Sequence, residues 1–251
     1  MMASSIGSGA ISAVGHNLHM WRHRFEREFV PASHRVVDVF LARLIPTFAS
    51  AGEEAQSYGK ELWDRAMSDW GDPDISEAEV ADAVREAEVE YYLNLTGMEQ
   101  GILNCCALFL YHLFEQHLLT FHRQELLHWR EQNDTKLLKH DEIHSRLHKK
   151  GICTKSFASW GKLEELRHLA NTLKHGEGKS SRELASLAPD LFCRVGGVAG
   201  LAFSMSPRVY TPLLGDDVFV TERHVREYAV AIEGFWCELL AAMEPKAGAT
   251  G

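Results

Sequence analysis

Apolar side chains recur at helical spacing along most of the chain. Between residues 16 and 50 they fall three or four positions apart, and Pro31 and Pro46 interrupt the pattern, which predicts two helices. Residues 55–70 predict a third helix. Ser76 and Glu79 form a capping box, and no proline follows until after Gln132. This stretch therefore predicts one very long helix or two nearly collinear ones.

The second half of the chain predicts shorter helices. An amphipathic stretch ends at Gly151, and a further helix is expected over residues 156–176 with Gly176 at its C-cap. Ser181 is placed to cap a short helix, and Thr221 to begin the last one. Only residues 207–220 resemble strands, which predicts a small β-hairpin there.

Together these elements predict an all-α fold, a bundle of long antiparallel helices that bury their apolar stripes against one another. We expect a single helical domain over residues 16–243. Flexible tails are expected at residues 1–15 and 244–251, where no helical pattern is present.

Composition adds limits on the class of protein. With 251 residues, 45% apolar and 24% charged, the chain is typical of a globular protein with one or two cores. The five cysteines form no C-x-x-C pair, which indicates reduced thiols in the cytoplasm. The N-terminus lacks the pattern of a signal peptide, and the longest apolar run, residues 101–114, is too short to span a bilayer. We therefore expect no membrane association.

Charge is divided unevenly along the chain. The net charge of −9 argues against indiscriminate binding to nucleic acid. Residues 136–182, however, carry eleven basic and five acidic side chains, a local net charge of +6, whereas residues 53–90 carry −10. This division fits either unevenly charged solvated helix faces or a local site for an anionic ligand.

The basic segment also contains the most distinctive string of polar residues. Arg167, Asn171 and His175 are spaced four apart, which places them on one face of a helix. An imidazole can exchange protons near neutral pH, and a guanidinium stabilises charge on phosphate oxygens, so this stripe could act on a phosphodiester. Alternatively, Lys174, His175 and Gly176 simply form a basic helix end that complements the helix dipole.

Residues Ala170–His175 resemble the Arg-polar-x-x-x-His signature of the HEPN superfamily, and the resemblance covers residues 76–176. Many members of that superfamily are metal-independent RNases of bacterial defence and toxin systems. Their His and Arg line a cleft at a two-fold interface and promote attack of the ribose 2′-hydroxyl on phosphate. Asn171 matches the polar position and His175 the histidine. Ala170 stands where the arginine is expected, so either Arg167 substitutes from the preceding turn or the domain is a non-catalytic relative.

The resemblance implies a homodimeric endoribonuclease that binds RNA and needs neither a metal nor another cofactor. His175 would then be the acid/base, Arg167 the phosphate clamp and Asn171 the orienting group, with further phosphate contacts from the basic side chains of Lys174, Lys179 and Arg182. The alternative is a non-enzymatic helical interaction protein, in which the charge asymmetry guides docking to a partner subunit.

Two further sets of residues are candidate sites. Arg123 and His128 fit the HEPN spacing without a gap, although the Lys and Gly that follow the first match are absent. His140, His144 and His148 are spaced four apart on a predicted helix, a pattern that can bind a metal ion. Because lysines adjoin them, a protonatable basic surface face is the favoured interpretation.

Overall fold

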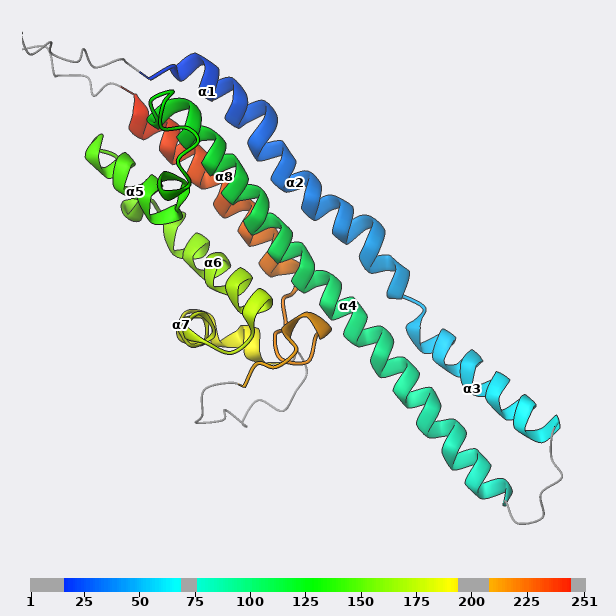
Figure 1. The fold of residues 1–251 in the computed structure, drawn as a ribbon. Helices are drawn as coiled ribbons and strands as arrows, with labels where there is room; N and C mark the ends of the chain where they lie inside the picture. The colour runs from blue at the N-terminus through cyan, green and yellow to red at the C-terminus, as the bar shows by residue number, and fades with distance from the viewer. Residues whose placement is uncertain (1–15, 69–75, 194–207, 245–251) are drawn as a thin grey trace, which may run out of the picture.

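The computed structural model describes residues 16–68, 76–193 and 208–244, and every regular element in these ranges is helical. This confirms the predicted all-α class. The longest helix, α4 (Glu77–Phe121), has 45 residues and runs through the whole molecule (Figure 1). The two predicted tails lie outside the described residues, apart from Glu244.

The N-terminal helices form one rod along α4 (Figure 1). A π-helical turn, Phe25–Phe29, joins α1 (Leu18–Arg24) to α2 (Val30–Val39), and a second, Phe40–Leu44, leads into a 3-10 turn (Ile45–Phe48). The predicted break at Pro31 is therefore wrong. Each proline follows directly after a π turn, in which the N–H of Val30 or Ile45 bonds five residues back. The wider turn makes room for the proline ring, which would otherwise clash with the carbonyl four residues earlier.

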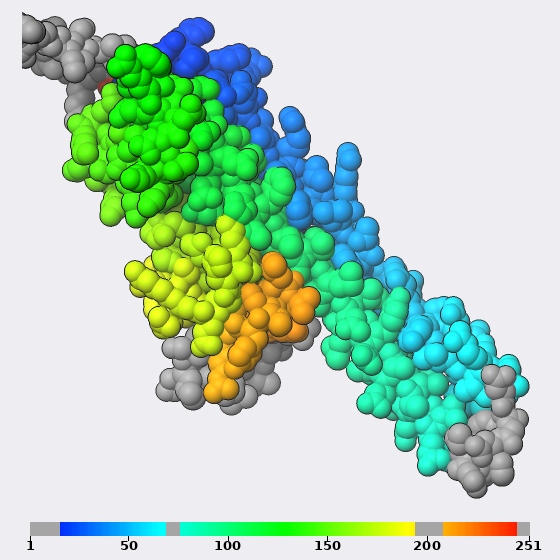
Figure 2. All heavy atoms as spheres, viewed as in Figure 1, coloured from blue at the N-terminus to red at the C-terminus, as the bar shows by residue number. Residues whose placement is uncertain are grey.

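Helix α3 (Ala51–Ser68) continues in the direction of α2, and the first half of α4 packs along it in the opposite direction (Figure 1). The capping box at the start of α4 is confirmed, since the Ser76 N–H donates to Glu79 Oε2 over 2.8 Å and Ser76 Oγ accepts from the Glu79 N–H. The long helix is single, and it ends through a π turn, His122–Leu126, before the predicted end at Gln132. Together, α3 and the first half of α4 form a hairpin that projects beyond the body (Figure 2).

The remaining helices are α5 (His140–Lys149), α6 (Trp160–His175), α7 (Lys179–Leu187) and α8 (Glu222–Met243). Gly151 and Gly176, with φ of 84° and 68°, follow α5 and α6 as predicted, because only glycine adopts these angles without strain. Thr221 caps α8 as expected. Ser181 is not the N-cap residue of α7, because the helix begins earlier, at Lys179; from the third position its hydroxyl accepts from the N–H of Gly178, the N-cap residue.

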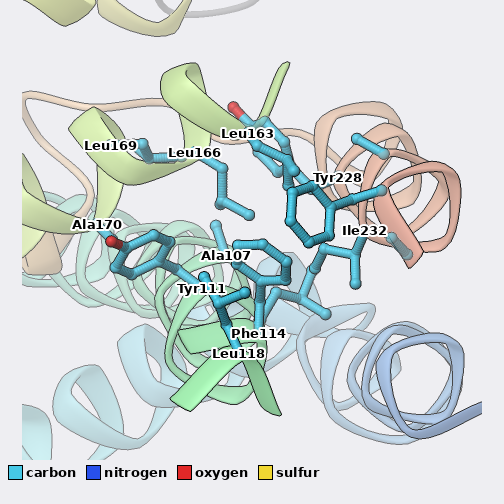
Figure 3. Packing of buried hydrophobic residues seen from close by; sticks show 14 of the residues in the cluster. Ala107, Tyr111, Phe114, Leu118, Leu163, Leu166, Leu169, Ala170, Tyr228 and Ile232 are labelled. Atoms are coloured by element: carbon cyan, nitrogen blue, oxygen red, sulfur yellow. The ribbon is translucent and has the colours of Figure 1, made fainter. Parts of the chain in front are cut away.

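The core lies where α4, α6 and α8 meet (Figure 3). Tyr111 and Phe114 of α4 are buried there with Leu166 of α6 and with Tyr228 and Ile232 of α8. The aromatic side chains that the sequence distributes over distant segments thus come together in one interior, and their burial dominates the stabilisation. None of the helices in the described ranges combines the length and apolar character needed to span a bilayer.

The predicted β-hairpin at residues 207–220 is wrong for residues 208–220; residue 207 lies outside the described residues. This segment contains a 3-10 turn, Pro212–Leu214, and no strand. Asn104 of α4, fully buried, donates from Nδ2 to the carbonyls of Pro212 and Val218 (2.7 and 2.9 Å) and accepts from the Val220 N–H (3.2 Å). The polar backbone groups are satisfied by this side chain, so pairing between strands is not needed.

Candidate functional site

A cavity of about 490 Å³ opens between α5 and α6. Three histidines of α5, His140, His144 and His148, lie on one side, and Glu164 and Arg167 of α6 lie on the other. The connection between the two helices adds Thr154 and Lys155, and the first residue of α6 adds Trp160. We call this the histidine cavity. Its volume is within the range of small-molecule and cofactor sites.

His140 and His144 are in direct contact. Their Nε2 atoms lie 3.2 Å apart, and Nδ1 of His144 lies 2.8 Å from the hydroxyl oxygen of Thr154, which is buried. The ring of Trp160 stands edge-on to that of His144, with centroids 4.9 Å apart. These contacts fix His144 in the wall, whereas Nδ1 of His140 bonds to no described residue: the nearest carboxylate oxygen, on Asp141, is 3.8 Å away.

Burial sets the charge of this pair. It lowers the pKa of His144 to about 3, with the neighbouring His140 adding to the shift, and burial together with Arg167 lowers the pKa of His140. Both imidazoles are therefore neutral at pH 7. The expected protonatable surface face is wrong for these two residues, because the helix turns them inward. Only His148 is exposed as expected.

Arg167 is held by a carboxylate on its own helix. Its Nε and Nη2 each donate to Glu164 over 2.8 Å, and this bonding raises the pKa of the guanidinium. Nη2 also lies 3.3 Å from Nε2 of His168. Within the described ranges Nη1 has no partner, so two N–H donors are left for a ligand in the cavity.

The structure does not bring the predicted catalytic residues into one site. Lys174 and His175, at the end of α6, line a different hollow of about 420 Å³, which faces residues 209–214. Arg167 lies eight positions before His175 on α6, which separates them by about 12 Å along the helix axis. Asn171, half-buried, lies between the two hollows and lines neither of them.

The other predicted residues are dispersed. Ala170, at the position of the HEPN arginine, is fully buried in the core. Lys179 and Arg182 are exposed on α7. Arg123 and His128 do not share a helical face, since the helix ends between them at Leu126, and both are exposed.

No metal cluster supports the alternative interpretation of the histidines. In the parts of the chain that the structure describes, no three His, Cys, Asp or Glu side chains converge to hold an ion. The five cysteines, all in described segments, are unpaired.

Sequence reasoning missed several members of the cavity. The spacing of His140 and His144 was visible in the sequence, but nothing in it indicated that α6 would face them with Glu164 and Trp160. Comparison of the chain with family models, with curated proteins and with solved structures finds no significant match.

Proposed function

We propose that this protein binds RNA and cleaves it by metal-independent acid–base chemistry in the histidine cavity. One observation carries the proposal: a guanidinium with free donors faces a pair of uncharged imidazoles 3.2 Å apart. All the residues that line the cavity come from the basic segment of the chain, residues 136–182. The HEPN resemblance adds a bacterial defence or toxin system as the setting and the cytoplasm as the location.

His140 can make both proton transfers, and His144 sets its tautomer. When Nδ1 of His144 donates to Thr154, its Nε2 accepts from Nε2–H of His140, and Nδ1 of His140 is left as a proton acceptor. This nitrogen takes the proton of the ribose 2′-hydroxyl as the 2′-oxygen attacks phosphorus. The P–O5′ bond then breaks, and the imidazolium returns the proton to the leaving oxygen. The products are a 2′,3′-cyclic phosphate and a 5′-hydroxyl.

The other side chains of the cavity have supporting roles in this scheme. Arg167 donates from Nη1 to the non-bridging phosphate oxygens, and Glu164 keeps the guanidinium in place. Lys155 adds a positive charge at the rim. Trp160 offers an aromatic surface beside the pair, a group on which a base can stack.

Cleavage of a labelled RNA in the presence of EDTA tests the proposal. We expect Arg167→Ala to lose at least about 100-fold in rate, because the transition-state charge is no longer stabilised. His175→Ala should retain activity. If His175→Ala is inactive and Arg167→Ala is not, the site is the hollow at the end of α6 instead. If the wild-type protein neither binds nor cleaves any RNA, the proposal is wrong and a non-enzymatic interaction protein is favoured.

A further inference from the structure

The side chain of Trp129 lies on the surface, in the loop between the π turn His122–Leu126 and α5. It is 68% exposed. The guanidinium of Arg130 covers one face of its ring, with Cζ 4.9 Å from the ring centroid. The ring of His128 lies beside it, with centroids 5.6 Å apart. Because most of the indole is exposed, the described residues leave its second face open.

The loop that carries Trp129 is held in place by ion pairs. Glu131 accepts from Nη1 and Nη2 of Arg146 on α5 over 3.2 and 3.0 Å, and from the backbone N–H of His128 over 2.9 Å. Arg146 is itself fixed, since its Nε donates to Glu142 over 3.0 Å. A surface that is held in this way loses little conformational entropy when a ligand binds.

The exposed charges around Trp129 are mainly basic. Residues 122–139 expose one carboxylate, that of Asp134, and four basic side chains: Arg123, Arg130, Lys136 and Lys139. The other two carboxylates of this segment, Glu125 and Glu131, are bonded within the protein. Two cations from other helices bond to the segment, Arg24 and Arg146, and each is paired with a carboxylate of its own helix. The surface is therefore positive on a chain of net charge −9.

Helix α5, at the edge of the molecule in Figure 1, separates this surface from the histidine cavity. Arg146, which holds the loop, comes two positions after His144, which lines the cavity. Because an α-helix turns by about 100° per residue, the two side chains lie on nearly opposite sides of α5. The exposed ridge between them carries Asp141 in the first turn and Lys149 in the last. A chain of phosphates that crosses the C-terminal half of α5 thus meets a cation.

We propose that Trp129 and Arg130 anchor the RNA strand that the histidine cavity cleaves, an inference that rests on the proposed function. A base some nucleotides from the scissile phosphate stacks on the open face of the indole, and the phosphates between the two sites contact Arg130 and Lys149. Stacking on an aromatic side chain beside cations is a common way to hold a single strand. No other large apolar side chain of residues 122–150 is exposed, so the surface lacks the apolar patch of a protein interface.

Fluorescence anisotropy of a labelled 2′-fluoro hexa-adenylate tests this anchor, because the probe keeps the bases and phosphates of RNA but has no 2′-hydroxyl to react. We expect Trp129→Ala to raise the dissociation constant at least about fivefold. Trp129→Phe, which keeps an aromatic ring, should restore most of the affinity. Tyr210→Ala removes an aromatic side chain that is also 68% exposed but lies outside this surface, and it should leave the affinity unchanged. Circular dichroism verifies that each variant is folded.

Cleavage kinetics separate the anchor from the cavity. With an RNA hexanucleotide, Trp129→Ala should raise KM and leave kcat unchanged. With a dinucleotide, which is too short to reach both sites, it should change neither. Wild-type affinity in Trp129→Ala, or equal losses on the two substrates, would overturn the anchor and leave cleavage in the cavity standing. Binding that depends on Trp129 without any cleavage would support the anchor and contradict the proposed reaction. A wild-type protein that does not bind the hexa-adenylate would overturn the anchor.

Discussion

At the scale of single residues, Asn104 shows how one polar side chain organises a segment more than a hundred positions away. It is fully buried, and its amide makes three hydrogen bonds to the backbone of residues 212–220. An exposed asparagine of the same helix, Asn94, offers a matched comparison.

We expect Asn104→Leu to lower the free energy of unfolding by about 2–4 kcal/mol, because two carbonyls and an N–H lose their partner inside the protein. Asn94→Leu should change it by less than about 0.5 kcal/mol. Urea unfolding of both variants measures the difference. Equal effects of the two substitutions would show that Asn104 does not hold the loop.

The partly buried histidine pair predicts a loss of stability in mild acid. An unfolded histidine titrates near 6.5, whereas burial lowers the pKa of His144 to about 3. Below pH 6.5 the unfolded chain takes up a proton that the folded chain does not. The free energy of unfolding therefore decreases as the pH is lowered, by up to about 1.4 kcal/mol per pH unit for this group.

His144→Gln should therefore flatten the stability profile between pH 6.5 and 5, a range above the titration of most carboxylates. His148→Gln, one turn further along α5 at an exposed position, is the control and should leave the slope unchanged. Thermal unfolding over this pH range provides the readout. A profile with the wild-type slope in His144→Gln would contradict a neutral histidine pair in the folded protein.

At the scale of elements, the sequence predicted helix ends correctly where the contacts that fix them are made by neighbouring residues. The capping residues Ser76 and Thr221 and the terminal glycines Gly151 and Gly176 lie where the sequence predicted them. Pro31 was misread as a helix break because a π turn depends on bonds five residues apart, which leave no mark in apolar spacing. The loop at residues 208–220 was misread because its bonding partner is the distant side chain of Asn104.

Two glycines test how closely the elements pack. A Cβ at Gly101 of α4 would lie 2.5 Å from the carbonyl oxygen of Leu213, a backbone atom, whereas one at Gly161 of α6 meets nothing within 4 Å. Gly101→Ala should thus destabilise the fold by about 1–3 kcal/mol. Gly161→Ala should be neutral or stabilise it by up to about 1 kcal/mol. Chemical denaturation compares them, and a stabilising Gly101→Ala would show that the loop does not rest on α4.

At the scale of the whole molecule, the site depends on contacts that the sequence did not reveal. Helical spacing correctly placed His140 and His144 on one side of α5, and Arg167 and His175 on α6. Which of these residues share a site is decided by how α5 and α6 face each other across the cavity, because Arg167 and the histidine pair line it together, whereas His175 lines another hollow. Tertiary packing of this kind depends on shape and has no short sequence signature.

The most direct measurement is the rate of RNA cleavage in EDTA by His140→Ala relative to His23→Ala. Both substitutions remove one imidazole, but His140 contacts the second histidine of the cavity, whereas His23 is exposed on α1 and does not line the cavity. We expect His140→Ala to lose about 100-fold or more and His23→Ala to remain within a few-fold of the wild-type protein. Equal rates for the two variants, in a wild-type protein that does cleave RNA, would contradict catalysis in the histidine cavity.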